Sequence, residues 1–212
     1  ATDILIIDPA AGTASRSTMG LTLPAVGDWA GGVLGPDGKI YGIPYHNSNI
    51  LIIDPVAGTA STSAMGASLS GADKWVGGSI APDGKIYCAP YNSADILIID
   101  PAAGTASRSA MGASMSGGGG KWKFCALGAN GKIYGLPFDT DTILIIDPAA
   151  GTASTSAMGA SLSDSNKFNG VTQAFDGNLY ACPATSTTIL KISEGADPPD
   201  DDAVLSGWVN KL

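Results

Sequence analysis

The sequence is poor in the residues on which most catalytic and metal-binding sites depend. Its 212 residues include one histidine, His46, one glutamate, Glu194, and three cysteines, Cys88, Cys125 and Cys182. One histidine cannot build a His-rich metal site, and the cysteines are not clustered. No segment has the density of oxygen ligands found in a calcium loop. We therefore expect no catalytic residue, no metal and no cofactor, and predict that the protein is not an enzyme.

Charged residues and long apolar runs are also scarce. Asp, Glu, Lys and Arg make up 14% of the chain, and the net charge is −8. An acidic chain has no general attraction for nucleic acids or anionic membranes. The longest aliphatic runs have four residues, far fewer than the roughly 20 that span a bilayer. We predict neither nucleic-acid binding nor membrane insertion, while the hydrophobic content of 44% indicates a folded core.

The sequence leaves the cellular location open. Position 1 is Ala, no basic and apolar leader is recognisable, and the chain begins inside a repeat. We therefore expect a processed product or a piece of a longer protein. Richness in Ser, Thr and Gly favours an extracellular over a cytoplasmic location without fixing it. The cysteines are expected to be buried or partly buried thiols, of which at most one pair could form a disulfide.

What the sequence has in abundance is an internal repeat. The segment ILIIDP, followed by AGTAS, begins at Ile4, Ile50, Ile96 and Ile143, and a divergent copy, ILKIS, begins at Ile189. The spacings are 46, 46, 47 and 46 residues. This period predicts one repeat domain over residues 1–195, with a half-repeat at the N-terminus, three full repeats and a divergent last repeat. Residues 196–212 are expected to form an acidic linker and a C-terminal tail.

Each repeat is expected to contain four short β-strands. In one unit, residues 75–81, 85–90, 96–99 and 105–110 are strand-like and separated by turn-forming residues. Asp83-Gly84 favours a tight hairpin, because both residues tolerate a positive φ. The four aliphatic residues at 96–99 point alternately to opposite faces, so both faces must be buried.

This pattern predicts an all-β fold, a β-propeller of four-stranded antiparallel blades with about 46 residues each and four to five blades in the chain. A parallel β-helix is the weaker alternative, because its coils are shorter and lack regular hairpins. The repeats supply about 17 strands, which blades of four do not divide evenly. Either the N-terminal pair completes the last blade, or about half a blade is missing upstream, or two chains combine their incomplete ends.

The repeat resembles the kelch repeat. A DGKIY segment recurs in the second strand, as Asp37–Tyr41, Asp83–Tyr87, Asn130–Tyr134 and, more loosely, Asp176–Tyr180. An Asp-Pro pair follows the third strand. The kelch glycine pair after the second strand is replaced, for example by Ile43-Pro44, and the kelch tryptophan of the fourth strand by residues such as Ala60. The resemblance implies a propeller fold and a tendency to bind proteins or sugars, and supplies no catalytic residue.

Aromatic residues supply the candidate ligand-binding positions. One group recurs in the first strand, where it could stack on sugars or pack between blades. Another group lies beside the loop after the second strand, where side chains reach a surface more easily, and the histidine follows its first member. The candidates are Trp29, Trp75, Trp122, Phe168, Tyr45, Tyr91, Phe138 and His46.

Recurring charged residues are expected to be structural or solvated. Two lysine positions could form a positive ring for an anionic ligand, although solvated side chains are the more common case: Lys39, Lys85 and Lys132, and Lys74, Lys121 and Lys167. The aspartate of each Asp-Pro pair is expected to cap its own turn. Departures from the repeat are better places to look for function: His46, Lys123, Phe124, Cys125, Asp139, Asp141 and Gln173.

These observations favour a non-enzymatic propeller that binds a protein or glycan ligand through its loop faces. The alternative is a structural protein whose open strand edges pair with another copy, giving dimers or fibres. A hydrolase built on a propeller scaffold is the least favoured interpretation.

Overall fold

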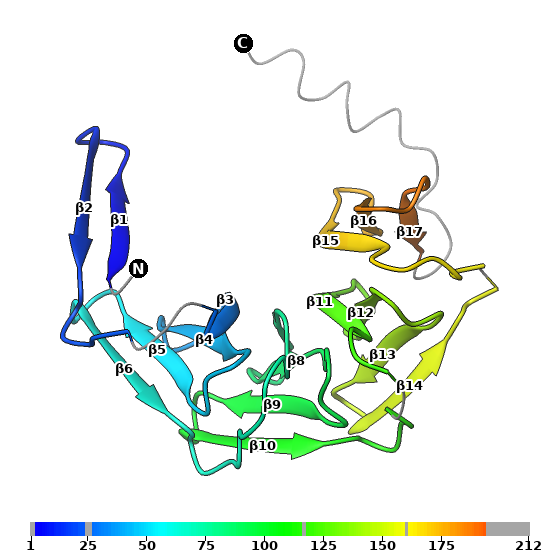
Figure 1. Cartoon of the computed structure of the whole chain (residues 1–212), viewed down its shortest axis with the longest axis horizontal. Helices are drawn as coiled ribbons and strands as arrows, with labels where there is room; N and C mark the ends of the chain where they lie inside the picture. The colour runs from blue at the N-terminus through cyan, green and yellow to red at the C-terminus, as the bar shows by residue number, and fades with distance from the viewer. Residues whose placement is uncertain (1–2, 24–26, 116–117, 160, 194–212) are drawn as a thin grey trace.

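The chain folds into a series of antiparallel β-sheets arranged as propeller blades. The computed structural model describes residues 3–23, 27–115, 118–159 and 161–193. Within these residues, a two-stranded hairpin precedes four sheets that follow one another along an arc (Figure 1). The hairpin stands at one end of the arc and the last sheet at the other. The all-β propeller of mostly four-stranded antiparallel blades is confirmed, with four blades.

The strands of each blade follow chain order from the inner side of the arc to the outer side. The N-terminal hairpin contains β1 (Ile4–Asp8) and β2 (Thr13–Ser17). The first blade contains β3 (Trp29–Leu34), β4 (Ile40–Pro44), β5 (Ile50–Asp54) and β6 (Thr59–Ser63). The second contains β7 (Ser79–Ile80), β8 (Ile86–Cys88), β9 (Ile96–Asp100) and β10 (Thr105–Ser109). The third contains β11 (Trp122–Leu127), β12 (Ile133–Pro137), β13 (Ile143–Asp147) and β14 (Thr152–Ser156). The last contains β15 (Phe168–Gln173), β16 (Leu179–Pro183) and β17 (Leu190–Ile192).

The innermost strand of each blade is less regular than its sequence suggests. The strand expected at 75–81 is reduced to β7, with an isolated bridge between Trp75 and Pro90. In the third blade the pairing of β11 with β12 shifts register between Trp122 and Cys125. The register shifts because residues in this stretch hydrogen-bond to the neighbouring blade instead of to β12. The Phe124 amide donates to the Val76 carbonyl of the second blade at 2.9 Å. These strands therefore divide their backbone bonds between two sheets.

Close approach of the innermost strands depends on glycine. Gly77 has a φ of 72°, and a Cβ there would lie 2.9 Å from Cδ1 of Phe124 and 3.1 Å from its Cα. A side chain at Gly77 would therefore push the second and third blades apart. Phe124 itself replaces a glycine of the repeat and keeps a φ of 60°, a conformation that is strained for an aromatic residue.

The third strand is buried on both faces in the second and third blades, as predicted, whereas in β5 of the first blade only Ile50 is buried. In β9 and β13 the first, second and fourth residues of ILII are buried and the third is partly buried. One face packs on the preceding blade and the other on the following blade, as in the cluster that joins Tyr41 and Ile43 to Trp75, Leu97 and Ile99. The copy in β1 departs from this prediction, because Leu5, Ile6 and Ile7 are exposed. Identical residues are thus buried only where blades flank them on both sides.

The three cysteines differ in burial. Cys88 and Cys125 are buried thiols, while Cys182 is exposed, and all three are unpaired. Burial raises the pKa of the Cys125 thiol to about 12, so it is a packing residue. The described residues contain no helix long and apolar enough to cross a membrane. The predicted acidic linker and tail at 196–212 lie outside the described residues.

Replacing Ile99 with alanine tests the two-faced burial. Ile99 is 0% exposed, whereas Ile7, at the same position of the repeat, is 65% exposed. We expect Ile99→Ala to lower the free energy of unfolding by about 2–5 kcal/mol, because it removes buried methyl groups and leaves a cavity. Ile7→Ala is the matched control and should change it by less than about 1 kcal/mol. Urea titration followed by tryptophan fluorescence measures both. Equal losses of unfolding free energy in the two variants would contradict the burial of Ile99 between two blades.

Candidate functional site

The loops after the second strands and the segments before the first strands meet on one side of the propeller, here called the loop face. A relay of backbone hydrogen bonds crosses this face from blade to blade. In it, Tyr45 donates to Asp28, Lys74 to Tyr45, Tyr91 to Lys74, Lys121 to Tyr91, Phe138 to Lys121, Lys167 to Phe138 and Ala184 to Lys167, at 2.8–3.1 Å between nitrogen and oxygen. We call this series the inter-blade relay. The relay holds in place the backbone of the loops that carry the candidate residues.

The first-strand aromatics lie beneath the loop face. Trp75, Trp122 and Phe168 are buried, and Trp29 is partly buried. The indole nitrogen of each tryptophan donates to a main-chain carbonyl 20 residues later, at 2.7–2.8 Å: Trp29 to Asn49, Trp75 to Asp95 and Trp122 to Thr142. These side chains are thus occupied in packing and in anchoring the loop after the second strand.

The second aromatic group forms a row across the loop face. The ring centroids of Tyr45 and Tyr91 are 6.0 Å apart, and those of Tyr91 and Phe138 are 5.7 Å apart. The three rings come from consecutive blades, and each is partly buried. We call Tyr45, Tyr91 and Phe138 the aromatic row. Spacings of this size give weak mutual attraction and leave apolar ring surface for a ligand.

His46 closes one end of the aromatic row. Its ring stacks on Tyr45 with centroids 4.4 Å apart, and its Nε2 lies 2.7 Å from Oδ1 of Asp73 in the next blade. The Asp73 carboxylate also interacts with the Tyr45 hydroxyl. Burial and this carboxylate raise the pKa of Tyr45 to about 12, while the same Tyr45 and His46 contacts lower the pKa of Asp73. His46 therefore joins two blades.

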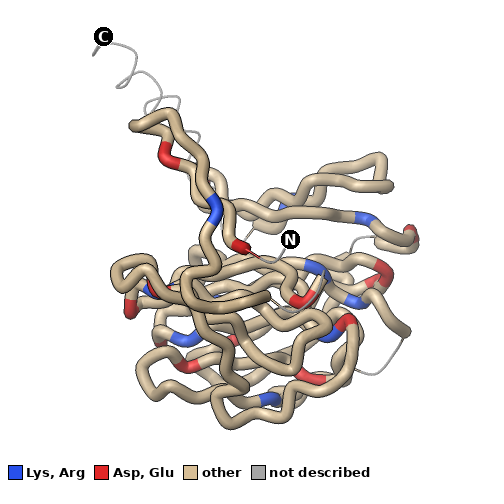
Figure 2. Tube along the Cα trace, turned by 60° about the vertical axis from the view of Figure 1, so that its left-hand side comes forward, with Lys and Arg blue, Asp and Glu red and all other residues tan. Residues whose placement is uncertain are grey.

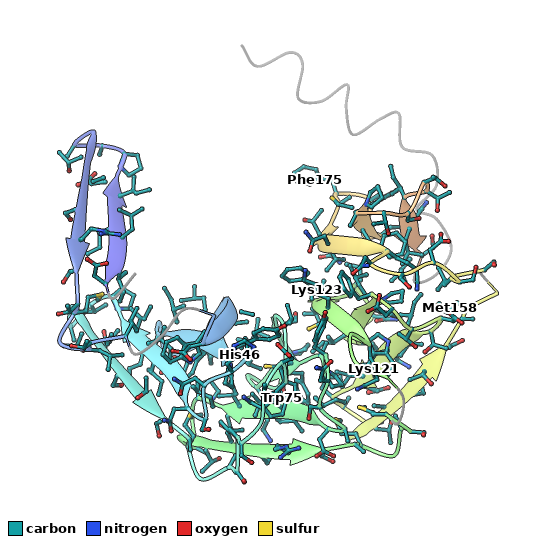
Figure 3. The ribbon with its side chains drawn as sticks, viewed as in Figure 1. His46, Trp75, Lys121, Lys123, Met158 and Phe175 are labelled. Carbon is teal, nitrogen blue, oxygen red and sulfur yellow. The ribbon has the colours of Figure 1, made fainter. Side chains whose placement is uncertain are left out.

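Lys123 closes the other end. Its Nζ lies 4.8 Å from the ring centroid of Phe138 and 5.5 Å from that of Phe124, and it donates to Oδ1 of Asn169 at 2.7 Å. Figure 3 shows Lys123 on the inner side of the arc, between β11 and β15. Lys123 and Phe124 both depart from the repeat. The structure brings them together with one member of the aromatic row.

The residue that follows each member of the aromatic row contacts the next blade, through a different side chain in each repeat. After the aromatic row residue, the first blade has His46, which contacts Asp73. The second has Asn92, whose Oδ1 accepts from the Gly120 amide at 2.7 Å. The third has Asp139, whose Oδ1 accepts from the Asn166 amide at 2.8 Å. Asp139 and His46 thus act as blade connectors.

The prediction that the lysines before the first strand are solvated is wrong. Lys74, Lys121 and Lys167 are all buried. The Lys74 ammonium donates to the carbonyls of Tyr45, Asn47 and Gly71 at 2.7–3.1 Å, and Lys167 donates to the carbonyl of Asp164. Burial lowers the pKa of all three lysines. The long side chain reaches loop carbonyls beneath the surface, which a sequence position alone does not reveal.

The remaining recurrent charges behave as predicted. Lys39, Lys85 and Lys132 are partly exposed and pair with Asp37, Asp100 and Asp147 at 3.3–3.8 Å between nitrogen and oxygen. The Asp-Pro aspartates cap their own turns: Asp8, Asp54, Asp100 and Asp147 each accept at least one backbone amide two or three residues later. Figure 2 shows acidic and basic residues interspersed along the loops.

A polar pocket of about 370 Å³ opens on the loop face of the third blade. Threonine hydroxyls and two charged side chains dominate its lining. Its lining residues are Ser114, Gly118, Gly119, Lys121, Trp122, Asp139, Thr140, Thr142 and Thr155. Sequence analysis had marked Asp139 and the position of Trp122, and missed the threonines because the pocket arises only when they assemble. The described residues contain no group of three or more His, Cys, Asp or Glu that could hold a metal ion.

Comparison with known proteins identifies the fold. No protein-family model matches the sequence, and no curated protein matches it. A catalytically inactive virginiamycin B lyase from Staphylococcus aureus, solved with quinupristin, is 18% identical with a TM-score of 0.66, over 91% of this chain and 63% of that chain. A streptogramin B lyase is 15% identical with a TM-score of 0.61, over 90% and 61%. An auxiliary nutrient binding protein from Bacteroides ovatus is 16% identical with a TM-score of 0.62, over 90% and 51%.

These similarities show that the chain has a β-propeller fold, and they do not show its family or its function. The chain spans less than two thirds of the length of each of the three structures. They include lyases and a binding protein, and none is named as a kelch protein. The propeller fold implied by the kelch resemblance is thus confirmed, while its membership of the kelch family in particular is not.

Replacing the buried lysines one at a time tests their unequal roles. Lys74→Met removes three hydrogen bonds to loop carbonyls and should lower the free energy of unfolding by about 1–3 kcal/mol. The matched change Lys121→Met removes no such bond within the described residues, and should leave stability equal or higher because a buried charge is lost. Urea denaturation of the two variants measures the difference. A larger loss for Lys121→Met would contradict this assignment.

Proposed function

We propose that the protein is a non-enzymatic binding scaffold, and that a protein or glycan ligand binds to the aromatic row on its loop face. The observation that carries the proposal is the row itself: three partly buried rings from consecutive blades, bounded by His46 and Lys123. Such a surface offers apolar faces for stacking and polar groups at both ends. The kelch-like pattern and the nutrient-binding neighbour agree with a binding role.

The scaffold supports this role through its rigidity. Each row residue lies in the inter-blade relay, so its backbone is held by two blades. A preorganised surface loses little conformational entropy when a ligand binds. The polar residues nearest the row are engaged in blade-to-blade contacts, as Asp73 and Asp139 show. A binding surface therefore fits this geometry better than an acid–base centre does.

Tyr91→Ala tests the aromatic row at its centre. Once a ligand is found on glycan and peptide arrays, we expect this change to weaken its binding by about tenfold or more, since a stacking partner is lost. Phe175→Ala is the control, because Phe175 is a fully exposed aromatic in a hairpin turn at the opposite end of its strands. Surface plasmon resonance measures both. Unchanged affinity of Tyr91→Ala in a folded protein would place the ligand elsewhere.

Self-assembly is the second candidate function, favoured by a separate observation. The third strands of the first three blades pair on both sides, whereas β1 pairs only with β2 in the described residues. Its open edge and exposed Leu5, Ile6 and Ile7 are available to an additional strand. At the other end of the arc, Met158 and Phe175 are exposed (Figure 3). Both ends thus present uncovered apolar residues.

Ile6→Lys tests self-assembly, because it copies the lysine that the divergent last repeat carries as Lys191. We expect it to lower the average mass seen by sedimentation at high protein concentration, since a charge on an open edge opposes strand addition. Val56→Lys adds the same charge at a turn residue that is 96% exposed and serves as the control. A native protein that is monomeric at every concentration would eliminate this function.

A further inference from the structure

The polar pocket of the third blade corresponds to a filled position in the second blade. There, Arg108 projects from the outermost strand over the Trp75 ring, with its guanidinium carbon 5.4 Å from the ring centroid. It donates to the Ser68 carbonyl at 3.1 Å and to Oδ2 of Asp95 at 3.0 Å, and reaches the Ser93 hydroxyl at 3.5 Å. The guanidinium therefore occupies the space above the tryptophan and links the surrounding loops.

The third blade lacks both charged partners. Arg108 pairs with Leu97 in the sheet register, and the residue paired with the equivalent Leu144 is Thr155. Asp95 accepts the Trp75 indole bond, and the residue that accepts the Trp122 bond is Thr142. Two short hydroxyl side chains thus replace an ion pair. The space that the guanidinium would fill is part of the pocket of about 370 Å³.

Lys121 gives this pocket its second distinguishing feature. It is 5% exposed and lines the pocket. Lys74 uses three loop carbonyls as acceptors, and Lys167 uses the Asp164 carbonyl and lies 4.0 Å from Asp141. Across the described ranges, the Lys121 ammonium has no such hydrogen bond or ion pair. The segment between Ser114 and Lys121 has six residues where that between Ser68 and Lys74 has five.

We propose that this pocket binds a monosaccharide unit that carries a carboxylate, such as a hexuronate, with Lys121 contacting the carboxylate and the threonines contacting hydroxyls. The proposal rests on the binding function above and places a second contact beside the aromatic row, since Asp139 follows Phe138. A pocket of this volume suits a small ligand of one or two rings. It joins an aromatic floor, Trp122, to hydroxyl groups from Thr140, Thr142 and Thr155.

The charges of the pocket select this ligand class. The Lys121 ammonium faces the pocket from an otherwise buried side chain and makes no ion pair within the described residues, so it gains most from an anion. Asp139, the other charged lining residue, already accepts the Asn166 amide through its Oδ1. A cation would be repelled by Lys121, and Thr142 stands where the carboxylate of Asp95 balances Arg108 in the second blade. The hydroxyls of Thr140 and Thr142, 3.4 Å apart, can donate to or accept from a sugar hydroxyl. A purely apolar ligand would give the Lys121 ammonium no polar partner.

The test fills the pocket with the ion pair that occupies the equivalent space in the second blade. In Thr142→Asp/Thr155→Arg, an ion pair like that of Asp95 and Arg108 should cover Trp122 and exclude the sugar. We expect titration calorimetry with glucuronate and galacturonate to show one site in the native protein and none in this variant. Glucose and galactose, the uncharged counterparts, should bind about tenfold more weakly than the acids. Retained uronate binding in the filled variant would overturn the proposal.

Two further variants isolate the role of Lys121. Lys121→Met should weaken uronate binding by about tenfold while leaving the weak binding of neutral sugars unchanged. Arg108→Thr/Asp95→Thr opens the equivalent space in the second blade, where the Lys74 ammonium is already occupied by carbonyls. We expect that variant still to bind one uronate. A second equal site, or a Lys121→Met variant with unchanged affinity, would contradict the role of the free ammonium.

Failure of this inference can be told apart from failure of the proposed function. Tyr91→Ala alters the aromatic row but none of the residues that line the pocket. If uronates bind and Tyr91→Ala has no effect on any ligand, the pocket stands and the aromatic row does not. If an array ligand depends on Tyr91 and no uronate binds, the aromatic row stands and the pocket assignment is wrong.

Discussion

The inter-blade relay is the interaction on which the rest of the loop face depends. In the last three blades, the residue before the first strand accepts from the loop of its own blade and donates to the loop of the preceding blade. The relay uses only backbone groups, so side chains at its positions are free to vary. This explains how an aspartate, Asp28, can stand where the other blades have a lysine. It also holds Tyr45, Tyr91 and Phe138 close enough for their rings to touch.

Sequence patterns predicted the fold because each repeat carries local and long-range signals that agree. The Asp83-Gly84 hairpin, the capped turn after Asp100 and the two-faced aliphatic strand all appear where expected. The burial of Lys74 was missed, because a lysine at a strand start can extend to water or to loop carbonyls with the same sequence. The exposure of Ile7 was missed because burial depends on the neighbouring blade and not on the strand itself.

The candidate site was only partly predictable for a related reason. The positions of Tyr45, Tyr91 and Phe138 were marked by their place after the second strand. The pocket was not found, because it is defined by a difference between two repeats: Thr142 and Thr155 stand where Asp95 and Arg108 stand one blade earlier. Both members of the pair change together, and that paired change was visible in the sequence. Its meaning required knowing that the two side chains meet over a tryptophan.

The uneven burial of the repeated aliphatic strand has a consequence for how the molecule opens. In a linear array each unit draws stability from its neighbours, so inner units have two supports and terminal units have one. The second and third blades are flanked on both sides, whereas the β1–β2 hairpin and the last blade each have one open flank in the described structure. Thermal fluctuations should therefore fray the array from its ends inward. The pocket and most of the aromatic row lie in the part that unravels last.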